Sequence, residues 1–214
     1  MLQLQTFVFN PLQENTYVLF DETKECVVID PGCYEASEQY DLADFIETNQ
    51  LKVVKLLNTH CHVDHVLGNA FIKEKYKTKL YIHPIDEATL RAVKVYASHY
   101  GFFNYQDTEP DAFLKEGEAV TFGNQSLDVL FVPGHAPGHV AFYSAQEKIV
   151  IGGDVLFYNS IGRTDLPGGN FDTLINSIHQ KLFTLPDDVT VYPGHGPETT
   201  IGYEKRTNPF CALT

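Results

Sequence analysis

The chain has 214 residues and a formal net charge of −13, and 43% of its residues are hydrophobic. This length suits one large domain or two small ones, and the hydrophobic fraction is ordinary for a soluble globular protein. The acidic charge would repel a phosphate backbone and the sequence shows no local basic patch, so we exclude a nucleic-acid partner.

The N-terminus and the cysteines indicate the cellular compartment that we expect for the protein. Residues 1–6 lack the basic start and continuous apolar segment of a signal peptide. No stretch approaches the roughly 18 apolar residues that a membrane span needs, so we expect no membrane partner. Sparse cysteines without zinc-type pairing fit a reducing compartment, and we therefore expect a cytoplasmic protein. The cysteines are Cys26, Cys33, Cys61 and Cys211.

The first half of the chain alternates apolar runs with amphipathic segments. Short apolar runs predict strands at residues 4–9, 16–20, 26–30, 53–57 and 80–83. Apolar residues at helical spacing and a proline in a first turn predict helices at 35–49, about 64–76 and 84–98. Residues 100–111 mix turn residues with aromatic rings and predict a long irregular loop, which is either a lid or a plain surface excursion.

The second half repeats this rhythm. It predicts strands at residues 119–122, 127–132, 140–144, 148–151 and 189–192, and helices at 171–183 and about 198–205. Residues 131–135 and 191–195 are both an apolar strand followed by Pro-Gly-His. We infer a duplicated strand-and-helix unit, in which two mixed β-sheets face each other with helices outside. We expect one domain over residues 1–214.

A dense group of polar side chains follows the predicted strand at 53–57. Residues 58–65 are NTHCHVDH, which places three imidazoles and a carboxylate within six residues. Buried imidazoles without partners would be costly, whereas neutral His and ionised Asp are usual ligands of divalent metals. In an extended segment His60 and His62 project to one side, so this stretch predicts a metal site. Cys61, between them, should face the opposite side and serve packing.

The third ligand of that site must come from elsewhere in the chain. His135 emerges at a strand end after Pro-Gly and is the best candidate. A lone histidine after Pro-Gly is more often a turn residue, and the histidine cluster at 60–65 is what makes His135 a ligand candidate. His139 is a candidate to orient His135 through the second ring nitrogen, the alternative being a purely structural role.

A second metal site is predicted beside the first. Asp64 and His65 should point away from the first metal where the chain turns into a helix, and His195 would complete their site. Asp154 follows two glycines at another strand end, and its two carboxylate oxygens suit a bridge between two metals. Alone, Asp154 would be a helix cap or turn carboxylate. For Asp30, before Pro-Gly, we expect turn capping, with binding of the ligand loop or of the metal shell as the alternative.

The ordered motifs resemble those of the metallo-β-lactamase superfamily. They are residues 59–65 (THCHVDH), 133–135 (PGH), 153–154 (GD) and 193–195 (PGH). The resemblance covers nearly the whole chain and implies an αββα four-layer sandwich with metals at one edge, between the sheets. It also implies the ligand roles: His60, His62 and His135 for the first ion, Asp64, His65 and His195 for the second, and Asp154 as the bridge.

Within the superfamily, two segments are similar to the short, single-domain members of the glyoxalase II group. They are residues 160–169 (SIGRTDLPGG) and 193–201 (PGHGPETTI). This implies a hydrolase of acyl thioesters such as S-lactoylglutathione. Full-length members carry a further helical domain that supplies basic residues to glutathione; we expect none here, because the chain ends 19 residues after His195. Arg163 is a candidate substrate contact, the alternative being an ion pair with Asp165.

The expected mechanism uses two divalent ions, with zinc expected and iron or manganese as alternatives. A metal-bridging hydroxide would attack the thioester carbonyl, and Asp64 or Asp154 would accept a proton. One competing function is a mononuclear iron persulfide dioxygenase, whose iron would use only His60, His135 and Asp154. A lactonase and a non-catalytic metal binder are two others. The sequence leaves the oligomeric state and the thiol carrier open.

Overall fold

Two compact units make up the part of the chain that the computed structural model describes, residues 1–213. The first unit holds residues 1–114 and 121–126, and the second holds residues 115–120 and 127 onward. The described strands include two six-stranded sheets, β1 to β6 in the first and β7 to β10 with β13 and β14 in the second. The expectation of one domain over residues 1–214 stays a prediction, and Thr214 lies outside the described residues.

The first sheet has the strand order β1-β2-β3-β4-β5-β6. Strands β1 to β3 pair antiparallel, and β4 to β6 continue the sheet in parallel, so the sheet is mixed as predicted. Its strands are β1 (Gln3–Phe9), β2 (Glu14–Phe20), β3 (Glu25–Ile29), β4 (Lys52–Leu57), β5 (Leu80–Ile82) and β6 (Ala112–Phe113).

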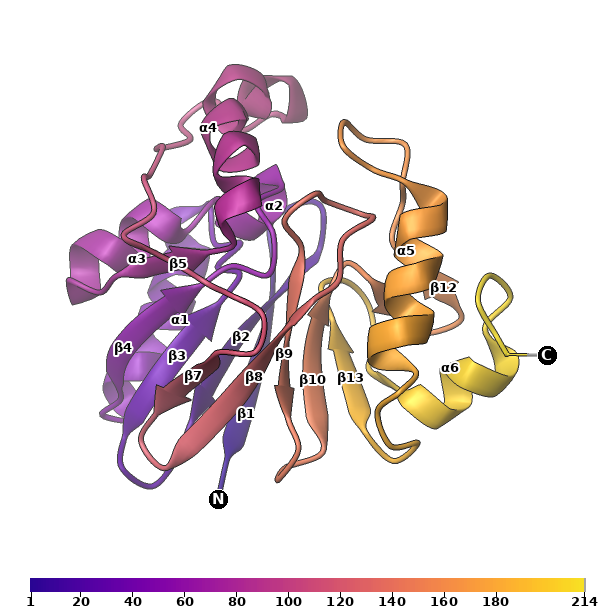
Figure 1. Cartoon of the computed structure of the whole chain (residues 1–214). Coiled ribbons are helices and arrows are strands. Elements are labelled where there is room, and N and C mark those ends of the chain that lie inside the picture. Colours follow the sequence, from indigo (N-terminus) through magenta and orange to yellow (C-terminus); the bar gives the residue numbers. More distant parts are fainter. Residues whose placement is uncertain (214) are drawn as a thin grey trace. The chain divides into compact units, whose positions relative to one another are not determined.

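Helices lie against this sheet (Figure 1). Their apolar side chains share one buried cluster with those of the strands. Helix α1 (Ala36–Thr48) buries Leu42 and Ile46 at i, i+4 spacing, and α3 (Asn69–Tyr76) buries Ile72 in the same core as the sheet residues. The remaining helical segments of this unit are α2 (Val63–Val66), η1 (Pro84–Asp86), α4 (Glu87–Tyr96) and η2 (Ala97–Tyr100).

The single helix expected over residues 64–76 is wrong, because the chain breaks between α2 and α3. At the break, the Gly68 amide donates to the Pro31 carbonyl oxygen at 2.7 Å. A Cβ atom on Gly68 would meet the Cys33 Sγ at 2.5 Å, so this close approach requires glycine. The loop before α1 and the start of α3 are therefore packed backbone against backbone.

The second sheet has the order β14-β13-β10-β9-β8-β7 and is also mixed. Its strands are β7 (Ala119–Phe122), β8 (Gln125–Phe131), β9 (Val140–Ser144), β10 (Ile149–Gly153), β13 (Thr190–Pro193) and β14 (Thr199–Thr200), and β11 (Leu156–Phe157) and β12 (Ser160–Ile161) form a separate hairpin.

Helices of the second unit pack on β10 and β13 (Figure 1). Helix α5 (Phe171–Ser177) continues as the π-helical segment η3 (Ile178–Leu182), and α6 (Ile201–Thr207) follows β14. Leu174 and Ile178 share a buried cluster with Val150 and Val191. The predicted helix over 171–183 is thus correct in extent, but its second half is π-helical.

The inferred duplication is visible in the strand pairing. In both sheets three strands pair antiparallel in sequence order, and a fourth then adds in parallel after a helix: β1-β2-β3-β4 and β8-β9-β10-β13. Asp30 after β3 and Asp154 after β10 are therefore equivalent positions. The two Pro-Gly-His motifs are not equivalent, since they follow β8 and β13. No helix within residues 1–213 is long and apolar enough to cross a membrane.

Candidate metal centre

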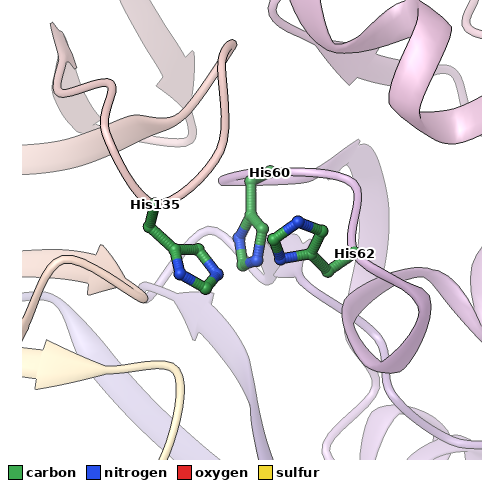
Figure 2. Close-up of side chains that lie close together, drawn as sticks. All are labelled: His60, His62 and His135. Carbon is green, nitrogen blue, oxygen red and sulfur yellow. The ribbon is translucent and has the colours of Figure 1, made fainter. Parts of the chain in front are cut away.

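The ligand loop, residues 58–62, joins the end of β4 to the start of α2. The rings of His60 and His62 meet edge to face with centroids 4.7 Å apart, and Figure 2 shows them side by side on this loop. The His65 ring lies 4.1 Å from that of His60. His60 and His65 are buried, whereas His62 is partly exposed. The first unit thus gathers its predicted histidine ligands in one place.

Asp30 anchors the ligand loop, so the turn-capping role that we expected for it is wrong. Its carboxylate accepts hydrogen bonds from the Thr59 amide at 2.7 Å and from the Thr59 hydroxyl at 2.5 Å. The same carboxylate lies 3.2 Å from His65 Nδ1. Asp30, His60 and His65 offer ligand-type atoms within 4.8 Å of one another. Because Nδ1 of His65 faces Asp30, its Nε2 is the atom directed at Asp64, 3.6 Å away.

Two polar residues of the first hairpin also support this loop, and sequence reasoning missed them. The Asn10 amide side chain donates to the main-chain oxygen of Asp64 at 3.2 Å. Glu14 is fully buried, with one carboxylate oxygen 3.8 Å from His65 Nδ1. Burial raises the pKa of Glu14 well above its ordinary value, although the nearby His65 lowers it. Both residues lie about fifty positions before their partners, and no local motif marks them.

In the second unit, Asp154 lies between two histidines. Its Oδ2 atom is 3.4 Å from His135 Nε2 and 3.6 Å from His195 Nε2. Asp154 and His135 are buried, and His195 is partly exposed. A Cβ atom on Gly162 would lie 2.0 Å from the Asp154 carbonyl oxygen and 3.2 Å from the His135 Cβ, so glycine is needed beside this cluster.

His139, the candidate to orient His135, forms a hydrogen bond with the Asp154 main chain. His135 Nδ1 faces the main-chain oxygen of Arg163 at 2.7 Å, so His135 donates there and keeps Nε2 for the Asp154 side. His139 instead accepts a hydrogen bond at Nε2 from the main-chain amide of Asp154, at 3.0 Å. His139 is fully buried, and this hydrogen bond therefore supports the main chain of Asp154, while its ring also lies edge to face against that of His135.

The Arg163 side chain forms the ion pair that was the alternative to substrate contact. Its guanidinium binds both carboxylate oxygens of Asp165 at 2.7 Å, and both side chains are exposed. The contact with the site is made by the Arg163 main chain, through His135. Sequence patterns do not reveal such a main-chain role, because any residue type could supply the carbonyl.

Cys61 packs away from the ligands, as predicted. It is fully buried within the core cluster of the first unit. Burial raises the pKa of its thiol far above the usual range, and the charge of Asp86 adds to the effect. A neutral thiol sealed in the core is not a nucleophile.

The donor geometry fits divalent metal. The Nε2 atom of His65 lies 3.6 Å from Asp64, and those of His135 and His195 lie 3.4 and 3.6 Å from Asp154. These separations exceed a charge-assisted hydrogen bond of about 2.7–2.9 Å. Two ligand atoms that are each about 2.1 Å from one tetrahedral ion stand roughly 3.4 Å apart. The nitrogen and oxygen donors are also the types that zinc, iron and manganese accept.

Comparisons with known proteins agree with these observations. The family model described as the metallo-beta-lactamase superfamily matches residues 9–195. The hydroxyacylglutathione hydrolase GloC of Haemophilus influenzae is 36% identical over 211 residues, covering 98% of each chain. A crystal structure titled BLEG-1 B3 metallo-beta-lactamase has a TM-score of 0.89 at 35% identity, covering 97% of this chain and 99% of that one. TTHA1623, solved in a di-iron-bound form, has a TM-score of 0.86 at 38% identity, covering 96% and 99%.

Proposed function

Because the chain belongs to the metallo-beta-lactamase superfamily and has its fold, we propose that it is a hydrolase of acyl thioesters that works with two divalent metal ions. The observation that carries the proposal is the Asp154 carboxylate, which has a histidine Nε2 atom on either side at 3.4 and 3.6 Å. One carboxylate between two imidazoles is the arrangement that a bridging ligand requires.

The proposed ligand sets are those expected from the sequence. As the family's pattern implies, His60, His62 and His135 would hold the first ion, and Asp64, His65 and His195 the second, with Asp154 shared. The relative solved in a di-iron-bound form supports two ions and makes iron the alternative to the zinc that we propose. Two such ions supply a water that loses its proton near neutral pH and a Lewis acid for the substrate carbonyl.

The side chains of this chain prepare the site for that chemistry. The Arg163 carbonyl and Asp30 fix the tautomers of His135 and His65, so that Nε2 of each imidazole faces a carboxylate. Asp64 and Asp154 are the carboxylates that can take a proton from water as it is consumed. A thioester suits such a site, because a thiolate leaves without needing a protonated acid nearby. Cys61 is too deeply buried to act as a covalent nucleophile.

The thioester proposal draws on the relative named hydroxyacylglutathione hydrolase, and one neighbour favours a second candidate. The structure titled as a B3 metallo-beta-lactamase is similar to this chain over 97% of its length. Cleavage of a β-lactam amide uses the same attack on a carbonyl, so it is a candidate for this site as well. The cytoplasmic location and the small-molecule substrate remain proposals.

A substrate panel with elemental analysis separates the candidates. The purified protein is assayed against S-lactoylglutathione, two other acyl thioesters, a lactone and a chromogenic cephalosporin, and oxygen uptake is followed with a glutathione persulfide. We expect two metal ions per chain and thioester turnover at least tenfold above the other substrates. One iron per chain with rapid oxygen uptake would contradict the hydrolase proposal. Cephalosporin turnover above that of every thioester would favour the second candidate, cleavage of β-lactam amides.

The two-metal requirement is tested with His65→Ala. This variant should bind one metal ion fewer and lose most thioester turnover. His99→Ala, which removes an exposed imidazole of the same unit, serves as the matched control and should behave as the unmodified chain. Full activity of His65→Ala with one metal ion would refute the two-metal mechanism.

A further inference from the structure

A second buried carboxylate, that of Asp86, contacts the ligand loop. Asp86 Oδ2 accepts a hydrogen bond from the Cys61 main-chain amide at 2.5 Å. Cys61 is the residue between His60 and His62. Both Asp86 and Cys61 are fully buried, so water does not replace this hydrogen bond. The hydrogen bond therefore holds the main chain between the two histidines that are proposed as ligands.

The sheet explains why Asp86 reaches this point. Strand β5 pairs in parallel with β4, and the Asn58 amide extends that pairing by donating to the Tyr81 oxygen at 3.1 Å. The chains leaving β4 and β5 thus emerge at the same edge. Beyond β5, the 3-10 turn η1 brings Asp86 to the start of α4, where a negative charge is favoured.

Asp86 and Asp30 hold the loop from opposite neighbours of β4. Asp30 follows β3 and binds the Thr59 amide, and Asp86 follows β5 and binds the Cys61 amide. The other oxygen of Asp86 accepts from the Thr89 hydroxyl at 3.1 Å. Each oxygen of the carboxylate therefore holds one segment: the ligand loop on one side and the first turn of α4 on the other.

We propose that Asp86 is a positioning residue for the metal, which acts through the Cys61 main chain to fix the directions of His60 and His62. The inference rests on the proposed metal site. Without the carboxylate, the buried Cys61 amide has lost its acceptor, and the loop must shift to satisfy it. A shift there turns both imidazoles, since each is attached to the residue next to Cys61.

A purely structural alternative is that Asp86 serves only to start α4. The variants Asp86→Ser and Asp86→Thr separate the two roles. Both side chains are favoured at helix starts, but both are too short to reach the Cys61 amide. Asp86→Asn is the conservative variant, because its side-chain oxygen lies at the same distance from the main chain as a carboxylate oxygen. It should still accept the hydrogen bond from the Cys61 amide and keep the loop in place.

The test uses Co²⁺ as the probe, without substrate. Metal-free full-length protein is titrated with Co²⁺ against a competing chelator, and the visible absorption of the bound ion is recorded. Asp86→Ser should bind Co²⁺ at least tenfold more weakly, with a changed ligand-field spectrum, as expected for residues that orient metal ligands. Asp86→Asn should stay within about threefold of the unmodified chain and keep its spectrum. Asp86→Thr repeats the test if Asp86→Ser does not fold.

Asp111→Ala is the matched control. The Asp111 carboxylate also accepts from a main-chain amide of β5, that of Leu80 at 2.8 Å, but at the strand end far from the ligand loop. It should bind Co²⁺ as the unmodified chain does. Unmodified affinity and spectrum in Asp86→Ser, or an equal loss in Asp111→Ala, would overturn the inference. Because no substrate is involved, a failure of thioester hydrolysis leaves this result unaffected, whereas an unmodified chain that binds no Co²⁺ overturns the metal site itself.

Discussion

His135 Nδ1 lies 2.7 Å from the main-chain carbonyl oxygen of Arg163, while the Arg163 guanidinium is paired with Asp165. One residue thus fixes a predicted metal ligand with its main chain and carries a surface ion pair with its side chain. The two roles are separable by substitution, because replacing the side chain leaves the carbonyl in place.

Arg163→Ala should therefore keep metal affinity within about twofold. Asp165→Ala should release the guanidinium and lower the KM for an anionic thioester by up to about fivefold, a small effect because an exposed ion pair is weak. The hydrogen bond from Arg163 lowers the pKa of Asp165 to about 2, so the KM difference should persist from pH 5 to pH 8. Steady-state kinetics at several pH values check this, and a KM that rises in Asp165→Ala would contradict it.

Asp30→Ala should destabilise even the metal-free protein. The substitution removes the acceptor of two hydrogen bonds from Thr59 inside a buried site. Hydrogen bonds to a charged group contribute about 1.5–3 kcal/mol each, so we expect a loss of roughly 3 kcal/mol in the free energy of unfolding. Urea unfolding without metal measures it. Asp41→Ala, at an exposed position of α1, should change stability by less than about 0.5 kcal/mol.

His139→Ala should weaken metal binding although His139 is not a proposed ligand. The Asp154 amide would lose its buried acceptor, and the carboxylate between His135 and His195 would move. We expect metal affinity to fall by about 10–100-fold, as for other residues that orient metal ligands. His139→Gln, whose amide oxygen can accept the same hydrogen bond, should restore most of it. Chelator competition is the measurement, and unchanged affinity in His139→Ala would show that the amide contact does not position Asp154.

Asp21 should contribute to acid stability. Although burial raises its pKa, hydrogen bonds from the Thr23 hydroxyl, the Asn124 and Thr23 amides and the Gln125 side chain outweigh burial and lower the pKa to about 2. The folded pKa lies below the ordinary value of 3.8. Its stabilisation is therefore present above about pH 3.8 and is lost as the pH falls towards 2.

Asp21→Asn tests that contribution. The variant should be less stable than the unmodified chain at neutral pH, by about 1–2 kcal/mol. The difference should shrink between pH 4 and pH 2, where the unmodified chain takes up the proton. Urea unfolding at pH 6, 4, 3 and 2 checks it. An equal gap at all four pH values would mean that Asp21 does not titrate in this range.

The sequence alone predicted the elements whose signals are local. Apolar alternation located the long strands, and the helical spacing of Leu42 and Ile46 located α1. The histidine-rich stretch at 60–65 indicated a metal site because its candidate ligands are neighbours in the chain. The strands β6, β11, β12 and β14 were not predicted, since each has two residues and no pattern of its own. The break at Gly68 depends on Pro31 and Cys33, which a helix pattern does not include.

What the sequence by itself determined, then, is the family, the fold class and the residue types that favour metal. The tertiary structure decided how those residues are held. Asp30, Asp86 and His139 reach the ligand-bearing segments through main-chain amides, and each contact joins residues 15 to 29 positions apart. A main-chain amide has no sequence signature. Which carboxylate or imidazole accepts its hydrogen bond therefore follows only from the sheet, which brings the ends of strands that are distant in the sequence to the same edge.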